Sequence, residues 1–351
     1  MKKIVTLLTS FLILLSACTS QATATPSTGP QTLTLMTHDS FSVSEDVVKS
    51  FEEANNAEVV FLQSGDAGSV LNRAILTKDA PLADLLFGVD NTFLSRSLEE
   101  DIFEPYESPL LAEIPDQYKL DPSHRTLPVD YGDVCINYDK AYFAENNLAV
   151  PQSLEDLTKP EYADLLVVEN PATSSPGLAF LLATVGHFGD SFTEYWQALK
   201  DNGVVVVDGW ETAYYNNFSG SSGRGPQPLV VSYGSSPAAE VFFSEKPLDE
   251  APTASIVGPD TCFRQIEFVG ILKGTDNRPL AEKFVDFMLS QEFQEDVPLQ
   301  MFVYPVNPNA ALPEVFTKYA QAAEQPASLP PEVIAENRDT WIQAWTDVVM
   351  K

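Results

Sequence analysis

The chain has 351 residues, of which 44% are hydrophobic and 11% aromatic, and its formal net charge is −30 at pH 7. The apolar and aromatic content excludes a disordered chain, and the negative charge argues against binding to nucleic acid or to anionic lipid. The length is sufficient for two lobes of ordinary domain size.

The N-terminus has the pattern of a secretory leader. Two lysines precede an apolar stretch over 4–15 that is too short to span a bilayer, which predicts a signal peptide over residues 1–17. Leu15-Ser16-Ala17-Cys18 resembles the bacterial lipobox, which implies acylation of Cys18 and anchoring to the membrane, in the periplasm or on the outer cell face. A plain secreted protein is the alternative. Residues 18–31 carry no charge and predict a flexible tether.

From residue 32 onward, strand-like runs alternate with amphipathic helical stretches. We predict strands over 32–37, 58–62 and 84–88, with helices whose apolar faces cover 47–54 and 70–75 between them. Strands that alternate with helices predict an α/β lobe.

A second set of elements begins near residue 165 and predicts a second α/β lobe. Its strands are predicted over 165–169, 204–207 and 228–233, and its helices after Pro176, through 195–199 and after Trp210. The C-terminal part is predicted to be helical over 279–289, 316–322 and 331–350, with Trp341 and Trp345 packing as core.

Two long extended runs, 129–138 and 264–272, lie between and after the two sets. We predict that they cross between the lobes as a hinge and so create a cleft. The predicted boundaries assign 32–134 with 266–351 to the first lobe and 135–265 to the second.

Two cysteines besides Cys18 fall in strand-like segments, Cys135 in 133–139 and Cys262 in 261–272. Outside the cytoplasm they can form a disulfide, which would tie the crossing strands together. Two separate buried thiols are the other reading of the same pattern.

The sequence shows no catalytic constellation. His38, His124 and His187 have no second ligand at metal-binding spacing, no cysteine lies in a CxxC pair, and Ser175 lacks the flanking glycines of a nucleophile elbow. We therefore predict a protein that is not an enzyme and needs neither cofactor nor metal.

Hydroxyl side chains precede two of the predicted helices of the second lobe. Ser174 and Ser175 come before Pro176, and Ser235 and Ser236 come before Pro237. Hydroxyls and free N–H groups at a helix N-terminus suit an anion such as phosphate. Ordinary helix capping explains the same residues.

Aromatic and acidic residues gather at other strand ends. Trp210, Tyr214, Tyr215 and Tyr233 offer aromatic faces in the second lobe, and the carboxylates of the first lobe are those of Asp66 and Asp90. Aromatic faces combined with carboxylates suit an organic cation, although a single aromatic residue is more often part of a core.

At these residues the chain resembles the thiamine-binding proteins of bacterial ABC importers, within the two-lobed type II periplasmic binding proteins. The matching pieces run in the same order from about residue 32 to 349: 37–41, 71–73, 83–91, 129–132, 173–178, 209–210, 232–233, 236–237, 284–290, 304–306 and Trp341. The resemblance implies capture of thiamine or its phosphates in an interlobe cleft and delivery to a permease.

The resemblance also implies site residues. Ser174, Trp210 and Tyr233 match positions around the phosphate or hydroxyethyl end and the rings, and Asp66, Asp90 and Asn91 match cleft positions of the first lobe. The family usually has tyrosine where this chain has His38, tryptophan at Phe302 and tyrosine at Ala239. His38 and Phe302 can still stack on a ring, but Ala239 cannot.

Adjacent tyrosines leave a second reading open. Tyr214 and Tyr215 resemble the ligand pair of ferric-binding proteins of the same superfamily, where phenolates and an anion hold Fe³⁺. That site would leave Trp210, Asp90 and Asn91 without a role.

Overall fold

The computed structural model describes residues 29–221 and 225–351. The predicted signal peptide and Cys18 lie outside these residues, as does most of the tether. Within the described part, no helix combines the length and apolarity needed to cross a membrane.

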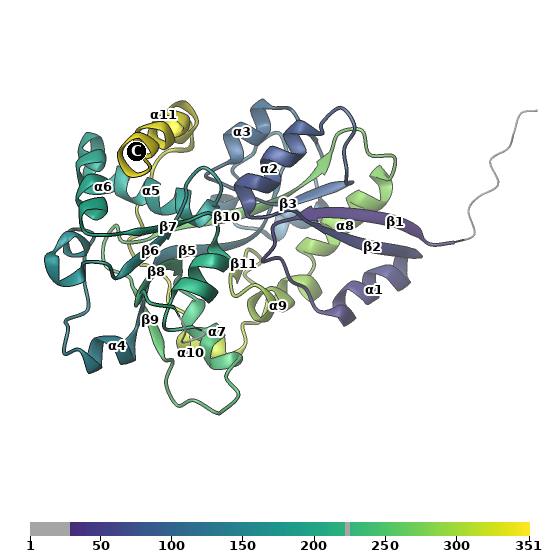
Figure 1. The fold of residues 1–351 in the computed structure, drawn as a ribbon. Helices are drawn as coiled ribbons and strands as arrows, with labels where there is room; N and C mark the ends of the chain where they lie inside the picture. Colours follow the sequence, from purple (N-terminus) through teal and green to yellow (C-terminus); the bar gives the residue numbers. More distant parts are fainter. Residues whose placement is uncertain (1–28, 222–224) are drawn as a thin grey trace, which may run out of the picture.

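In the described residues, eleven strands form one twisted sheet with helices on both sides (Figure 1). Their order is β2-β1-β3-β10-β5-β8-β6-β7, while β4 pairs with β10, and β9 and β11 pair with β5. The strands are β1 (Gln31–Thr37), β2 (Ala57–Gln63), β3 (Leu85–Asp90), β4 (Phe103–Glu104), β5 (Leu127–Asp139), β6 (Leu166–Glu169), β7 (Val205–Val207), β8 (Leu229–Tyr233), β9 (Thr253–Ile256), β10 (Phe263–Leu272) and β11 (Tyr304–Pro305). The predicted α/β class is confirmed.

The first lobe is built on β2, β1 and β3, which are parallel to one another. Its helices are α1 (Glu45–Asn55), α2 (Ala67–Leu76), α3 (Leu94–Glu99), α8 (Arg278–Leu289) and α9 (Gln291–Gln300). Phe51 of α1 and Phe284 of α8 meet edge to face, with ring centroids 4.9 Å apart. Segments far apart in the sequence therefore share one core.

The second lobe is built on β8, β6 and β7, also parallel to one another. Its helices are α4 (Lys140–Glu145), α5 (Ser175–Phe188), α6 (Phe192–Asp201), a π-helix over Thr212–Asn217, and α7 (Ser236–Phe242). Helix α5 begins at the N-cap Ser174 with proline in its first turn, as the sequence signals predict. It ends at Gly189. Its residues 175–185 are buried, so it forms the centre of this lobe.

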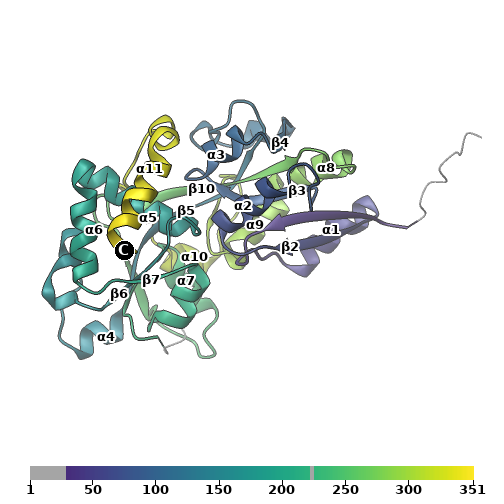
Figure 2. The same ribbon diagram turned by 45° about the horizontal axis from the view of Figure 1, so that its top comes forward.

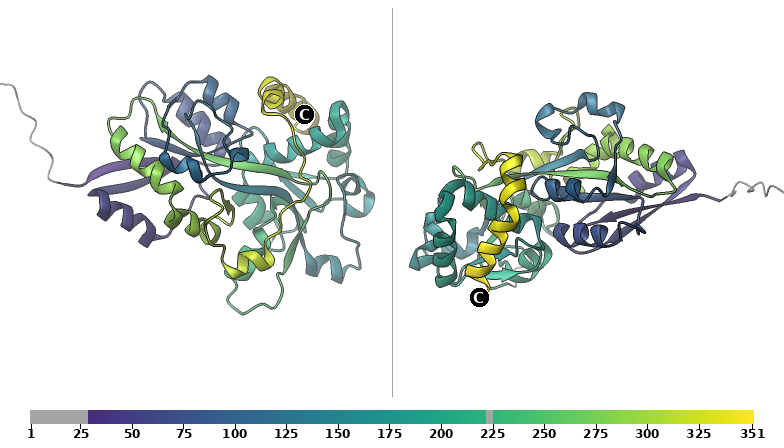
Figure 3. Two further views of the ribbon diagram at one scale, coloured as in Figure 1. Left: turned by 180° about the vertical axis from the view of Figure 1, so that it is seen from behind. Right: turned by 90° about the horizontal axis from the view of Figure 1, so that it is seen from above.

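The C-terminal segment returns to the second lobe through α10 (Glu314–Tyr319) and ends in α11 (Pro331–Val349). Figures 2 and 3 show α11 beside α6, and it also contacts α3. Trp345 is fully buried and meets Trp196 of α6 edge to face, with ring centroids 5.6 Å apart. Trp345 thus packs as part of the core, as predicted. Helix α11 contacts helices of both lobes. The predicted lobe boundaries stay a prediction.

The two long runs predicted to cross between the lobes are β5 and β10. They lie side by side, antiparallel, in the middle of the sheet (Figure 1). One edge of this pair, on β10, meets β3 of the first lobe, and the other, on β5, meets β8 of the second. Both strands therefore belong to both lobes.

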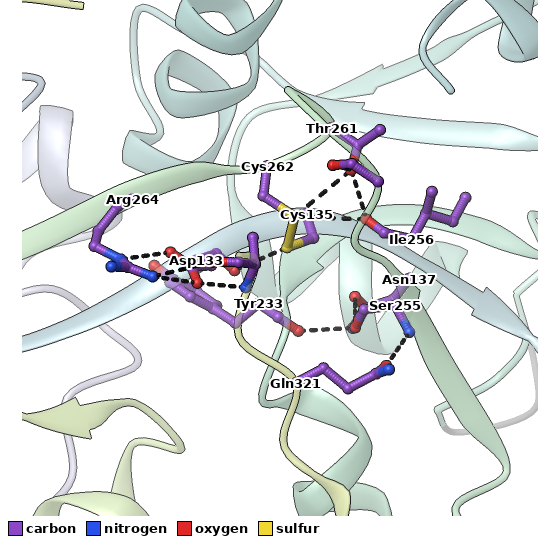
Figure 4. The surroundings of a disulfide bond; sticks show 12 residues. Asp133, Cys135, Asn137, Tyr233, Ser255, Ile256, Thr261, Cys262, Arg264 and Gln321 are labelled. Carbon is purple, nitrogen blue, oxygen red and sulfur yellow. Dashed lines mark hydrogen bonds and ion pairs between the residues drawn. A yellow bond between two sulfur atoms is a disulfide. The ribbon is translucent and has the colours of Figure 1, made fainter. Parts of the chain in front are cut away.

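A disulfide joins the crossing strands at the end nearer the second lobe. Cys135 of β5 bonds to Cys262, the residue before β10, with both side chains fully buried (Figure 4). Beyond the register pair of Phe263 and Val134, the Arg264 guanidinium donates to both carboxylate oxygens of its register partner Asp133, at 2.8 and 2.9 Å. The disulfide reading of the two cysteines is confirmed.

Candidate functional site

A cavity of about 530 Å³ lies where elements of both lobes meet. Its wall is formed by the loop after β1, the first turns of α2 and α5, the π-helix region, the end of β8, α7, the middle of β10 and residues 300–303. Strand ends and helix starts are the usual position of ligand sites in α/β sheets. The cavity is therefore the candidate functional site.

Trp210 is the centre of an aromatic wall. Its ring stacks on Tyr214 with centroids 5.0 Å apart and meets Tyr233 edge-on at 6.4 Å. The indole Nε1 donates to Ser232 Oγ at 2.9 Å, and Ser232 Oγ is 2.9 Å from Ser236 Oγ. These contacts fix the orientation of the indole, so the wall is formed before any ligand arrives.

His38 lies at the end of β1 on another side of the cavity. Gly88 of β3 makes room for it, because a Cβ at that glycine would come within 2.4 Å of the His38 ring. The backbone of Gly88 also has a φ of +99°, which favours glycine. His38 Nε2 is 3.4 Å from Glu267 Oε1.

Asp66 links the two lobes. As the N-cap of α2, its carboxylate accepts the Ala67 N–H, and it also accepts the N–H groups of Ser175 at 3.2 Å and Trp210 at 3.0 Å. Burial raises the pKa of the Asp66 carboxyl, and the hydrogen bond from the Trp210 N–H partly opposes that rise. This carboxylate therefore holds N–H groups that a phosphate would otherwise find free.

Eight of the twelve predicted binding residues line the cavity: His38, Asp66, Ser175, Trp210, Tyr214, Tyr233, Ser236 and Phe302. Chain segments more than 260 residues apart thus contribute to one wall. Ligand contact by these residues stays a prediction.

Asp90 and Asn91 do not line the cavity. The fully buried Asp90 accepts the Thr92 hydroxyl at 2.6 Å and a hydrogen bond from the Gln265 amide, and burial raises its pKa to about 6. Asn91 pairs through its side-chain amide with the backbone of Arg264 and Ile266 on β10. Both side chains hold β3 against β10, which corrects their predicted place on the cleft wall.

Ser174 and Ser235 are also buried behind the wall. Ser174 Oγ caps α5 by accepting the Gly177 N–H at 3.5 Å, and the Ser235 hydroxyl donates to the Phe302 carbonyl. Ser174 thus caps its helix, as the capping alternative predicts, whereas Ser235 makes no side-chain cap and bonds to a carbonyl 67 residues away in the sequence. Ser175 and Ser236 are the serines of the two turns that reach the cavity.

Sequence reasoning missed two kinds of lining residue. Carboxylates of Asp39, Glu211, Glu240 and Glu267 join Asp66 on the wall, where His38 is the single basic residue within 29–221 and 225–351. Phe243 lies one helical turn after Ala239, and its ring is 5.3 Å from that of Phe302. A signal for Phe243 existed in the four-residue spacing from Ala239. The wall combines aromatic faces with negative charge, which suits an organic cation.

Residues 80–323 match the family of bacterial extracellular solute-binding proteins. The chain belongs to this family. A thiamine-binding periplasmic protein of Escherichia coli (strain K12) is 32% identical over 346 residues, which cover 96% of this chain and 98% of that protein. A solved periplasmic thiamin binding protein has a TM-score of 0.80 at 28% identity, covering 92% of this chain and 97% of that one. The predicted type II fold is confirmed by this likeness.

A ferric binding protein from Campylobacter jejuni shares the fold of this solute-binding protein, with a TM-score of 0.73 at 20% identity and coverage of 90% of this chain and 99% of that one. The surroundings of the tyrosine pair in this chain disfavour iron binding. Tyr214 is buried and donates its hydroxyl to Glu240 Oε1 at 2.8 Å, and burial together with Glu240 raises its pKa well above the usual value. A ferric site needs phenolates, which this environment disfavours.

Proposed function

We propose that this solute-binding protein captures thiamine or a thiamine phosphate in the cavity and delivers it to the permease of an ABC importer. The observation that carries the proposal is the wall of Trp210, Tyr214 and Tyr233 facing carboxylates. Thiamine is a two-ring cation, and cation–π contacts contribute about 2 kcal/mol when desolvated. The names of relatives that match over nearly their whole length support the same ligand.

The ligand's rings would lie between Trp210, Tyr233 and His38, with its hydroxyethyl or phosphate end toward the turn of Ser236, because Asp66 occupies the N–H of Ser175. Closure would follow from contacts that exist only when both lobes touch the ligand. The crossing strands β5 and β10 are the elements about which the lobes would rotate. No covalent chemistry is required.

Isothermal titration of the purified protein with thiamine, thiamine phosphate, thiamine diphosphate and ferric citrate tests the proposal. We expect saturable one-to-one binding of at least one thiamine compound. If none of the three thiamine compounds binds, and the protein takes up iron with a tyrosinate absorption band, the ferric alternative at Tyr214 and Tyr215 replaces the proposal.

Phe243→Ala is expected to weaken thiamine binding by about 5- to 20-fold. The Phe243 side chain lines the cavity and is 67% exposed in the empty protein, so a ligand ring can cover it; an aromatic pair contributes about 0.5–1.5 kcal/mol beyond area burial. Phe242→Ala is the matched control, because Phe242 is adjacent and exposed but does not line the cavity. Equal losses in the two variants would contradict a role for Phe243 in the site.

We further propose that acylated Cys18 anchors the protein to the membrane, on the pattern of residues 1–18. Cys18→Ser is expected to move the protein from the membrane fraction to the soluble fraction and to abolish incorporation of labelled palmitate. Thiamine binding by the purified variant should be unchanged. An unaltered distribution between the fractions would refute the lipid anchor.

A further inference from the structure

Glu267 lies in the middle of β10 and is the most buried of the carboxylates on the cavity wall, with 7% of its surface exposed. In the sheet it stands directly opposite Asp90 of β3 on one side and Asp130 of β5 on the other. Three acidic residues therefore form one row across three neighbouring strands. Like charges at such cross-strand positions repel, so other interactions must offset the repulsion within this row.

A preference of Asp130 for its protonated form relieves part of the repulsion. Asp130 is fully buried, and neither of its carboxyl oxygens meets a donor among the described residues. Burial and the neighbouring Glu267 raise the pKa of Asp130 well above its usual value, and burial raises that of Asp90. A protonated Asp130 can donate to Glu267, which a carboxylate cannot. The pair therefore favours a proton on Asp130 and the negative charge on Glu267.

His38 stabilises that charge from the cavity side, 3.4 Å away. Burial opposes the ionisation of Glu267, but His38 and Asp130 outweigh it and hold the Glu267 pKa below its usual value. Burial also lowers the pKa of His38, whereas its acidic neighbours raise it, and the net shift is upward. The groups that influence this pair are Asp39, Asp66 and Glu211 near His38, and Asp90, Asp130 and Tyr233 near Glu267.

We propose that Glu267 is the counter-ion of the ligand's positively charged ring and that His38 occupies this partner position in the empty protein. The inference rests on the proposed function and identifies the residue that selects a charged ring. Glu267 has the geometry for the role, because it lies on a crossing strand and lines the cavity next to His38 and Tyr233. A charge interaction is strongest at the least solvated carboxylate.

The pH dependence of binding follows from the competition between His38 and the ligand. Above the pKa of His38 in the folded protein, its ring is neutral and Glu267 is available to the cation. Below that pKa, protonated His38 pairs with Glu267 and repels the ligand. Because this pKa is raised above 6.5, thiamine affinity should fall as the pH is lowered from 8 to 6. In His38→Gln the same change of pH should leave the affinity nearly constant.

The test compares thiamine with a neutral analogue in which a thiophene ring replaces the thiazolium ring. Glu267→Gln should weaken thiamine binding by about 10- to 100-fold and leave binding of the neutral analogue within about twofold. Glu155→Gln is the matched control, because Glu155 pairs with His187 at 2.7 Å outside the cavity and its loss changes the net charge equally. That variant should bind both compounds as the parent does.

The outcomes separate this inference from the proposed function. If the parent protein binds no thiamine compound, the proposed function fails and the inference fails with it. If the parent binds thiamine but Glu267→Gln weakens both compounds equally, the counter-ion role is overturned and the proposed function stands. Retained binding of the neutral analogue also shows that the variant has folded.

Discussion

Trp210→Ala is expected to weaken thiamine binding by about 100-fold or more. The indole has the largest aromatic face on the cavity wall, and it is held by stacking on Tyr214 and by the hydrogen bond to Ser232. Its loss removes a cation–π contact of about 2 kcal/mol and aromatic packing of about 1 kcal/mol, and about 1.4 kcal/mol corresponds to tenfold in affinity. Isothermal titration gives the affinity directly.

Trp341→Ala provides the control for Trp210→Ala. Trp341 is a partly buried tryptophan of α11 that packs on the core and does not line the cavity. Its removal should lower the melting temperature and leave thiamine affinity within about threefold. Trp210→Phe should recover part of the lost binding, since it restores an aromatic face. Affinity within threefold of the parent in Trp210→Ala would remove this wall from the site.

Replacing both Cys135 and Cys262 with alanine is expected to lower the free energy of unfolding by about 4–5 kcal/mol. The two residues are 127 positions apart, and closing a loop of that length restricts the unfolded chain by roughly this amount in the chain-entropy estimate. Such a loss corresponds to a fall in melting temperature of roughly 10 °C for a protein of this size. Calorimetry and denaturant titration measure the two quantities.

The disulfide variant should still bind thiamine, because neither cysteine lines the cavity. Reductant alone should act slowly on the folded parent, since both sulfur-bearing side chains are fully buried, and the parent's melting temperature should fall once the bond has been reduced under partly denaturing conditions. A melting temperature that is the same in the parent and the double variant would show that the bond contributes no stability. The single variants Cys135→Ala and Cys262→Ala should each show the full loss.

The crossing strands were predictable because their apolar residues form long runs without helical period. The predicted ranges 129–138 and 264–272 lie within β5 and β10, respectively. Helix α9 was missed, because it has few apolar residues and contains Pro298. Strand β9 is short and pairs with β5, so its formation depends on a partner more than a hundred residues away in the sequence.

The site was predictable where a strand end points its side chain into the cavity, as at Tyr233 and Trp210. The site prediction failed where the backbone already uses the side chain, either locally, as at Asp90 and Ser174, or from a distant segment, as at Ser235. Local sequence carries both possibilities, and packing decides between them. Sequence reasoning did not identify Glu267, which lies within an apolar strand. Its position opposite Asp130 depends on the register of strands far apart in the sequence.

The position of β10 in the sheet has a consequence for how the protein is made. This strand is among the last of the chain, yet it fills the place between β3 and β5. Until residues 263–272 have been synthesised, β3 and β5 each keep an open edge that invites pairing with other chains. The nascent protein therefore cannot complete its sheet during most of its synthesis, and polypeptides released early would be substrates for aggregation and proteolysis.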